Sequence, residues 1–224
     1  MGPVLSAFIA ALFLALPAAA NPADLCLSAA NRASQESGVP YDVLAAISLT
    51  ETGRTRQGRM DPWPWTVNLE GKGYWFDTQA EAEGFADQSY RSGYRSFDIG
   101  CFQINYRWHG EQFRSIAEMF DPLSNARYAA RFLSELFAEY GDWTRAAGAF
   151  HSRNEEFAGR YRARFTQLRN GLDGSPPEDV VVAMAEPARR SSTYVFMSGG
   201  TPGGLGSLMP RGQSARPLFE IVSR

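Results

Sequence analysis

The chain has 224 residues, which fits one domain of ordinary size with additional segments. Apolar residues make up 44% of the chain and aromatic residues 13%, enough to bury a core, and the formal net charge of −2 argues against nucleic-acid binding. Two cysteines and two histidines, with no CxxC or HExxH spacing, argue against a structural metal site.

Residues 1–20 have the pattern of a secretory signal peptide. Residues 4–16 form an apolar run that is too short to span a bilayer, and small residues at 18–20 follow as a cleavage signal. No lysine or arginine precedes the run, so an uncleaved short anchor remains an alternative. Both interpretations predict export. We expect the mature chain to begin at Asn21 and to keep no stable membrane span after cleavage.

The first two predicted helices cover residues 23–36 and 40–53. Gly38 is expected to end the first helix, and Pro40 begins the second. The apolar stripe of the second helix contains Val43, Leu44 and Ile47.

The two cysteines are expected to pair. Cys26 and Cys101 are the only thiols in the chain, and an oxidising compartment favours a disulfide between them. Two unpaired buried cysteines are the alternative.

A β-rich interruption follows the second helix. Residues 65–69 and 74–76 flank a glycine-containing turn and predict a small hairpin. Thr78 and Glu81 form a capping-box pattern for a helix that continues to about residue 90. Residues 91–110 are predicted to form a loop.

Three further helices are predicted at residues 121–141, 142–150 and 155–170. In the first, apolar residues recur at steps of three and four, and Gly141 is expected to end it. Residues 21–171 therefore predict an α+β domain that is predominantly α and carries a small β-hairpin.

Residues 172–224 have a different composition. They are rich in glycine and proline and contain only three of the 29 aromatic residues, so they predict a flexible, disordered tail. Residues 193–197 and 217–222 are the two patches that could dock on a partner. A solvated tail without a partner is the alternative.

Glu51 is the first candidate catalytic residue. It follows Ile47 by four residues and Leu44 by seven, so its side chain is expected to emerge along the apolar stripe of the second helix. Apolar surroundings raise the pKa of a carboxyl group, which makes Glu51 a candidate general acid at neutral pH.

Several segments, in the same order, resemble lytic transglycosylases of the soluble-lysozyme-like (SLT) type. Residues 46–53 resemble the catalytic Glu-Ser segment of that family, and residues 96–105 resemble its Gly-Leu-Met-Gln-Ile-Asn block. The other matching positions are Trp108, Asp121, Pro122, Asn125, the block 149–152, Glu156 and Tyr161. The resemblance implies a lysozyme-like (goose-type) fold. Residues 97–100 and 151–152 look most like the small members associated with secretion systems and flagella.

The resemblance implies an enzyme that acts on peptidoglycan in the periplasm of a Gram-negative bacterium. Such enzymes cleave the β-1,4 bond between N-acetylmuramic acid and N-acetylglucosamine and form a 1,6-anhydro sugar, without a metal or organic cofactor. By this resemblance Glu51 first donates a proton to the leaving oxygen and then accepts one from the C6 hydroxyl. A flagellar or secretion-system component is the partner expected for the tail.

The resemblance also implies residues that contact or support the glycan. These are Thr52, Gln103, Asn105, Phe150, His151 and Tyr161. The family has a tyrosine where this chain has Phe150, so Tyr161 or His151 is expected to hold Glu51 instead. Gln103 has the alternative of a loop-capping amide. Four aromatic residues are candidates either for stacking on sugars or for the core: Trp63, Trp65, Tyr106 and Trp108.

Three other functions remain open at this point. Hydrolysis of the lysozyme type requires a second carboxyl group, for which the candidates are Asp61, Asp77 and Asp98. A cysteine peptidase or amidase requires a free Cys101 thiolate near His109 or His151. A non-catalytic periplasmic assembly module would bind glycan without cleaving it.

Overall fold

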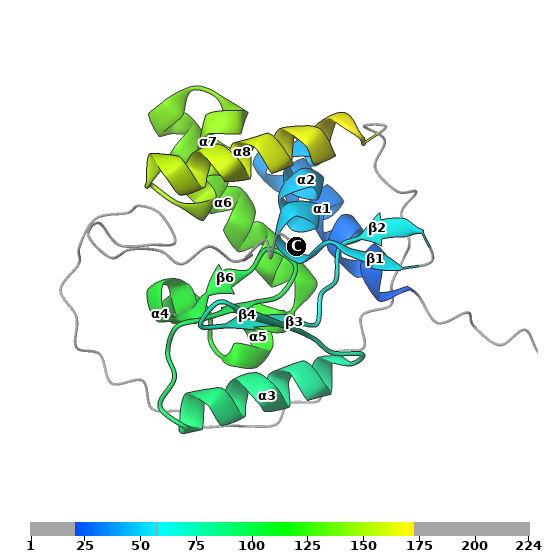
Figure 1. The fold of residues 1–224 in the computed structure, drawn as a ribbon, viewed down its shortest axis with the longest axis vertical. Coiled ribbons are helices and arrows are strands. Elements are labelled where there is room, and N and C mark those ends of the chain that lie inside the picture. The colour runs from blue at the N-terminus through cyan, green and yellow to red at the C-terminus, as the bar shows by residue number, and fades with distance from the viewer. Residues whose placement is uncertain (1–20, 57, 173–224) are drawn as a thin grey trace, which may run out of the picture.

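The computed structural model describes residues 21–56 and 58–172 (Figure 1). The predicted signal peptide, and all of the predicted tail except Leu172, lie outside the described residues. Leu172 packs against the core and is partly buried, so the packed domain extends one residue beyond the predicted boundary. The described part is predominantly helical and carries small antiparallel sheets, in agreement with the predicted fold class.

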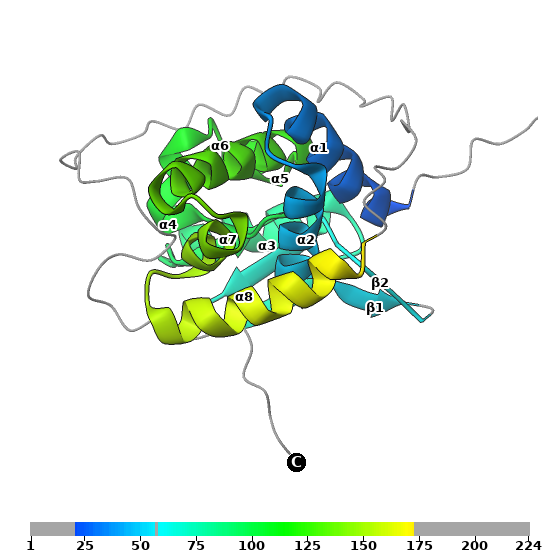
Figure 2. The same cartoon turned by 90° about the horizontal axis from the view of Figure 1, so that it is seen from above.

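Helix α2 (Tyr41–Thr52) lies between α1 (Pro22–Ser37) and α8 (Glu155–Asn170), as Figure 2 shows. Both neighbours pack against it, and its residues from Val43 to Thr52 are buried. Gly38 ends α1 in the left-handed conformation with φ of 78°, as predicted. The enclosure of α2 explains why a charged residue on it meets an apolar environment.

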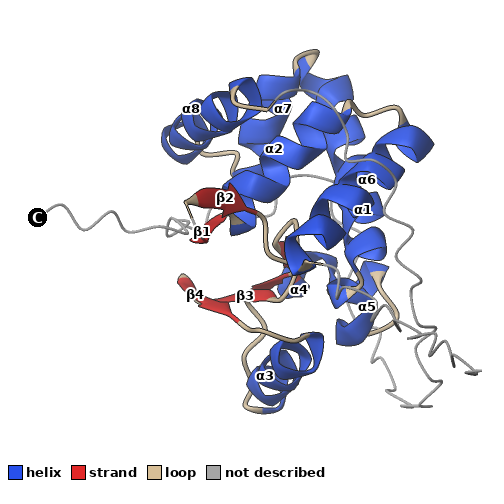
Figure 3. Ribbon diagram, turned by 90° about the vertical axis from the view of Figure 1, so that its right-hand side faces the viewer, coloured by secondary structure: helices blue, strands red, loops and turns tan. Residues whose placement is uncertain are grey.

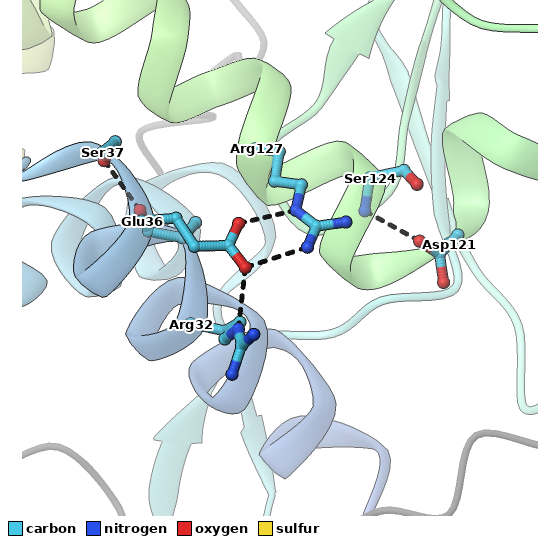
Figure 4. Close-up of polar contacts among 7 residues, drawn as sticks. Arg32, Glu36, Ser37, Asp121, Ser124 and Arg127 are labelled. Carbon is cyan, nitrogen blue, oxygen red and sulfur yellow. Dashed lines mark hydrogen bonds and ion pairs between the residues drawn. The ribbon is translucent and has the colours of Figure 1, made fainter.

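Helix α6 (Pro122–Tyr140) packs against α1 on one side and against α7 (Trp143–His151) on the other. The predicted ranges of these helices and of α8 are confirmed to within one residue at the ends. Asp121 caps α6 by accepting a hydrogen bond from the backbone N–H of Ser124 (2.8 Å), a contact drawn in Figure 4.

The larger sheet has the strand order β4-β3-β5-β6 and is antiparallel throughout. Its strands are β3 (Thr66–Leu69), β4 (Lys72–Trp75), β5 (Phe97–Ile99) and β6 (Ile104–Asn105). The β3–β4 hairpin confirms the predicted one, with a tight turn at Glu70 and Gly71, where φ is 51° and 89°. Figure 3 shows α3 (Gln79–Arg91) on the side of this sheet away from α2.

Six short helices and strands and one 3₁₀ turn were not predicted. Strands β5 and β6 and helix α4 (Tyr106–His109) lie within the segment predicted to be a loop. A second hairpin, β1 (Arg54–Arg56) with β2 (Arg59–Asp61), follows α2, and α5 (Ile116–Phe120) precedes α6. Gly110–Gln112 form a single 3₁₀ turn. These elements are too short to show a hydrophobic period.

A disulfide joins Cys26 of α1 to Cys101 in the turn after β5, which confirms the predicted pair. The same turn is held by the fully buried side chain of Asn125. Its Oδ1 accepts a hydrogen bond from the Phe102 N–H (2.9 Å), and its Nδ2 donates to the carbonyl oxygens of Ile99 and Met119. Gly100 has φ of 79° in this turn, and a Cβ there would approach Asn125 to 3.0 Å.

An ion-pair network joins α1 to α6 at the surface. Glu36 accepts hydrogen bonds from Arg32 and from Arg127 (Figure 4). The guanidinium groups of Arg127 and Arg32 lower the pKa of the Glu36 carboxyl to about 2. Within the described ranges, no helix has both the length and the apolar character that a membrane crossing needs.

Candidate active site

Glu51 lies in the last turn of α2 with 4% of its surface exposed. Ile47 and Leu44, one and two turns before it, are fully buried, so the carboxyl group emerges along the apolar stripe as predicted. Burial raises the pKa of the Glu51 carboxyl to about 8. Most Glu51 side chains are therefore protonated at neutral pH, the state that a general acid requires.

Tyr161 of α8 holds this carboxyl group. Its hydroxyl donates a hydrogen bond of 2.7 Å to Oε1 of Glu51, and burial raises the pKa of that hydroxyl well above its usual range. The hydroxyl therefore remains a donor across the pH range in which Glu51 titrates. This contact answers the choice left open by the sequence: between Tyr161 and His151, the tyrosine binds the acid.

His151 supports Tyr161 from α7. The two rings are stacked, with centroids 4.7 Å apart and planes inclined by 9°. Burial lowers the pKa of His151 to about 4, so the imidazole is neutral at neutral pH. The neutral ring fixes the plane of the tyrosine without adding a charge near Glu51.

The larger sheet contributes a row of three polar side chains, Asn68 on β3, Asp98 on β5 and Asn105 on β6. We call these residues the polar row. Asp98 is the register partner of both asparagines, and directly paired residues in an antiparallel sheet project to the same face. The Asn105 amide Nδ2 donates to Oδ1 of Asp98 at 2.7 Å.

Asp98 is electrostatically coupled to Glu51. Burial raises the pKa of Asp98 to about 7, although the hydrogen bond from Asn105 opposes the shift. Its charge in turn contributes to the raised pKa of Glu51. Of the three candidates for a second carboxyl group, Asp98 is the one near the acid. Asp61 pairs with Arg59 on the β1–β2 hairpin, and Asp77 is exposed before α3.

Asn105 has a free acceptor. Its Oδ1 is buried and forms no hydrogen bond with any described residue, while the side chain as a whole is 6% exposed. A buried carbonyl oxygen without a partner costs free energy until a donor reaches it. An N–H or O–H group of a bound ligand would meet that need beside Asp98.

Gln103 has the role of a loop-capping amide. Its Nε2 donates to the carbonyl oxygens of Gly100 (3.0 Å) and Thr66 (3.2 Å), and its own backbone has φ of 47°. These bonds tie the turn after β5 to the start of β3. The residue is 2% exposed, and its contact with a glycan stays a prediction.

Thr52 and Phe150, two of the expected ligand contacts, are both buried. The Thr52 hydroxyl is buried, donates to the Ser48 carbonyl oxygen (3.0 Å) and accepts from the Trp63 N–H (3.1 Å). Phe150 has no exposed surface and packs on the Phe132 ring. Both side chains are therefore held within the protein, and their contact with a glycan stays a prediction.

The four candidate aromatic residues divide between core and half-buried positions. Trp63 and Trp65 are 2% and 8% exposed and belong to the core. Tyr106 is half-buried and stacks on Phe97, and Trp108 is half-buried beneath the Arg107 guanidinium group. The core interpretation therefore holds for the two tryptophans that precede the sheet.

The disulfide rules out the cysteine-nucleophile alternative in this structure, because Cys101 has no free thiol. His109 is instead part of the packing of α6, where its Nδ1 lies 2.5 Å from the Tyr128 hydroxyl. Among the described residues, no group of three or more histidine, cysteine, aspartate or glutamate side chains is placed to hold a metal ion.

Sequence reasoning missed Asn68 and could not choose Asp98 from its alternatives. Both positions lie on strands of three or four residues, so no alternation marked the face on which they project. The one available signal was the spacing of Asp98 and Asn105 about a glycine-containing turn, which allows them to pair across two strands.

Residues 78–163 match the family model of the transglycosylase SLT domain. No curated protein and no solved structure matches the chain. The matched segment contains Asp98, Asn105, His151 and Tyr161, whereas Glu51 precedes it in the chain and joins it through the hydrogen bond of Tyr161. Residues 78–163 are thus similar to the SLT transglycosylases, whose domains are lysozyme-like and act on peptidoglycan.

Proposed function

We propose that this protein is a peptidoglycan lytic transglycosylase that uses Glu51 as its only proton donor and acceptor. The observation that carries the proposal is a buried carboxyl group, with its pKa raised to about 8, that is held by the Tyr161 hydroxyl and interacts electrostatically with Asp98 of the polar row. The SLT match to residues 78–163 supports the substrate class. The reaction would cleave the bond between N-acetylmuramic acid and N-acetylglucosamine.

The first step is protonation of the leaving oxygen. The Glu51 carboxyl transfers its proton to the glycosidic oxygen as the bond to C1 breaks, and the electron pair of that bond goes to the oxygen. The neighbouring acetamido group stabilises the positive charge that develops at C1. Glu51 is left as a carboxylate, and the Tyr161 hydroxyl stabilises it with the hydrogen bond that already exists.

The second step returns the proton. The C6 hydroxyl oxygen attacks C1, its proton moves to the Glu51 carboxylate, and a 1,6-anhydro ring closes. Burial makes the charged form of Glu51 unfavourable, which is the cause of its raised pKa and also favours this return. One carboxyl group therefore serves both steps and ends in the state in which it began.

Hydrolysis of the lysozyme type is a second candidate, because Asp98 lies near Glu51 and interacts with it electrostatically. In that reaction a water molecule replaces the C6 hydroxyl, and Asp98 acts on C1 or on the water. The pKa of Asp98, raised to about 7, weakens this candidate, since a nucleophile or base must be ionised. The two reactions give different sugar ends, so the products decide between them.

The cellular role belongs to the same proposal. The residues at 97–100 and 151–152 support a small periplasmic enzyme that opens the cell wall for a flagellar or secretion assembly. Export by the segment 1–20 and recruitment by the segment 173–224 fall outside the described residues, and both remain predictions.

The test is mass spectrometry of the soluble fragments that the purified protein releases from peptidoglycan sacculi. The variants are Glu51→Gln and, as a matched control, Glu135→Gln on the exposed face of α6. We expect anhydro-muropeptides from the wild type and the control, and a loss of about 10²- to 10⁴-fold for Glu51→Gln. Fragments with reducing ends in place of anhydro ends would show hydrolysis and refute the proposed reaction. If no protein, wild type included, released soluble fragments, a non-catalytic assembly module would be favoured.

A further inference from the structure

The two faces of the larger sheet differ in character. On one face, Val67 of β3 lies opposite Tyr74 of β4, and the Tyr74 ring packs on Phe85 of α3 with 4.6 Å between centroids. Successive residues of a strand project to opposite faces, so the polar row lies on the other face. Figure 3 shows α3 on the side of the sheet away from α2, the helix that carries Glu51. The polar row therefore faces the catalytic helix, and the charge of its member Asp98 acts on Glu51.

The face that carries the polar row continues onto β4, the edge strand of the sheet, at Gly73 and Trp75. Gly73 is the register partner of Asn68, and Trp75 follows it by two positions on the same face. The Trp75 ring lies over Gly73, because a Cβ placed on that glycine would be 3.0 Å from Cη2 and 3.2 Å from Cζ3 of the ring. The indole ring thus takes the place of a side chain at Gly73, next to Asn68 and in line with Asp98.

Trp75 is exposed although its side chain is large and aromatic. Its exposed fraction is 40%, compared with 2% for Trp63 and 8% for Trp65. Covering such a ring with another apolar surface removes area from water and is favourable. Ligand sites combine aromatic side chains with a few well-placed polar groups, and Trp75 beside the polar row has this composition.

A sugar ring is suited to this surface. One face of a β-linked pyranose presents C–H groups, which complement the negative face of an indole ring. The rim of the same sugar carries hydroxyl and amide groups that form hydrogen bonds. The buried Oδ1 of Asn105, which lacks a donor among the described residues, lies at the opposite end of the polar row from Trp75 and offers an acceptor to such groups.

The distance across the sheet indicates which sugar would contact Trp75. Asp98 lies on β5 and Trp75 on β4, with β3 between them. Two steps between neighbouring strands, each of about 4.8 Å, separate β5 from β4 by about 10 Å. This separation exceeds the length of one sugar ring. A sugar on Trp75 is therefore a neighbour of the units joined by the bond that Glu51 cleaves.

We propose that Trp75 binds the glycan by stacking on a sugar at least one unit away from the cleaved bond. This proposal rests on the proposed function, and in it the glycan crosses the strands of the larger sheet along the polar row. Trp75 is remote from the reacting atoms, so its contact is the same before and during the reaction. Such uniform binding lowers KM and leaves kcat unchanged.

The test measures kcat and KM on soluble, peptide-free glycan chains. We expect Trp75→Ala to raise KM about tenfold and to leave kcat within twofold of the wild type. Trp75→Phe keeps an aromatic face and should restore KM to within about threefold. The matched control is Tyr94→Ala, which removes an aromatic side chain of similar exposure, 43%, from the segment after α3, and it should change neither constant.

A second variant keeps the tryptophan and fills the place where its ring lies. Gly73→Val puts a branched side chain under the ring, which has to move away because even a Cβ there is in tight contact with it. We expect KM to rise in this variant too, although the indole is present. An unchanged KM would show that the position of the ring over Gly73 has no part in binding.

Two results would overturn the proposal. An unchanged KM in Trp75→Ala would show that the glycan does not contact the ring, and would leave the exposed indole to a partner other than glycan. An equal fall of kcat in Trp75→Ala and Trp75→Phe, with a lower thermal midpoint in both, would show that the tryptophan only supports the sheet.

A binding measurement separates this proposal from the proposed function. Calorimetric titration of Glu51→Gln with the same glycan chains measures binding without cleavage, and adding Trp75→Ala should raise Kd about tenfold. This difference is expected even if the wild type cleaves no glycan, a result that would refute the proposed function alone. Equal Kd values, with cleavage by the wild type, would refute the role of Trp75 alone.

Discussion

The site has a helical part, formed by α2 and α8, and a sheet part, formed by β3, β5 and β6. We call these the helical wall and the sheet wall, and each holds a carboxyl group in a different way. On the helical wall, Glu51 is 4% exposed and receives a hydroxyl hydrogen bond from Tyr161; on the sheet wall, Asp98 is half-buried and receives an amide hydrogen bond from Asn105. Burial raises both pKa values, to about 8 and about 7. The comparison teaches that burial is the main cause of both raised pKa values, and that the negative charge of Asp98 adds a further upward contribution to the pKa of Glu51.

Removal of the disulfide should have the largest effect, since it joins α1 to the sheet wall. In the chain-entropy model, a cross-link between residues 75 positions apart contributes about 4 kcal/mol. We expect Cys26→Ala with Cys101→Ala to lower the free energy of unfolding by that order, measured by urea denaturation. Wild-type protein under reducing conditions is the control, and similar stability with and without the bond would show that noncovalent contacts suffice.

Asn125→Ala should come second, because it removes three buried hydrogen bonds from the turn that follows β5. We expect a loss of about 2 to 4 kcal/mol in the free energy of unfolding. Ser124→Ala, at the neighbouring position of α6, should change it by less than about 0.5 kcal/mol. If the two variants were equally stable, the sheet wall would not depend on this asparagine.

Glu51→Gln should stabilise the protein as the pH rises. The folded pKa of about 8 exceeds the ordinary value of 4.5, so the folded state binds more protons than the unfolded state between these pH values, and wild-type stability falls across that window. The gain from the substitution should grow from pH 4.5 and reach on the order of 1 to 3 kcal/mol near pH 8. A gain independent of pH, in thermal unfolding at pH 5 and pH 8, would contradict the raised pKa.

Tyr161→Phe should lower the rate about tenfold and move the pH profile. The hydroxyl hydrogen bond lowers the pKa of Glu51, so its loss raises that pKa further and shifts the alkaline limb of the rate to higher pH. The conservative ring keeps the stack on His151, which separates the effect of the hydroxyl from that of packing. A lower rate with an unmoved alkaline limb would show that Tyr161 acts on the substrate instead.

Asp98→Asn should have the smallest effect on the rate. It should move the pH profile in the direction opposite to that expected for Tyr161→Phe. The Asp98 charge raises the pKa of Glu51, so its removal lowers that pKa and shifts the alkaline limb of the rate to lower pH. The anhydro product should remain the same. Complete loss of activity in this variant would show that Asp98 takes part in the reaction itself, beyond its effect on the pKa of Glu51.

The helical wall was predictable, while the sheet wall was only partly so. The stripe that contains Leu44 and Ile47 showed that Glu51 emerges among apolar residues, and the capping residues located the ends of the long helices. The positions of Asp98 and Asn105 depend on pairings between strands of two and three residues, and such pairings are set by tertiary contacts. The β1–β2 hairpin was not predicted for the same reason, because its two strands have three residues each.

The hydroxyl that holds the acid comes from far along the chain. Glu51 and Tyr161 are 110 residues apart in sequence, and α8, which carries the tyrosine, ends the described part of the chain. A polypeptide emerges from the ribosome or a translocation channel with its N-terminal end first, so Glu51 appears long before its donor. Catalytic competence therefore arises only after residue 161 has emerged and α8 has packed, and an incomplete chain that already contains both carboxyl groups would lack the working acid.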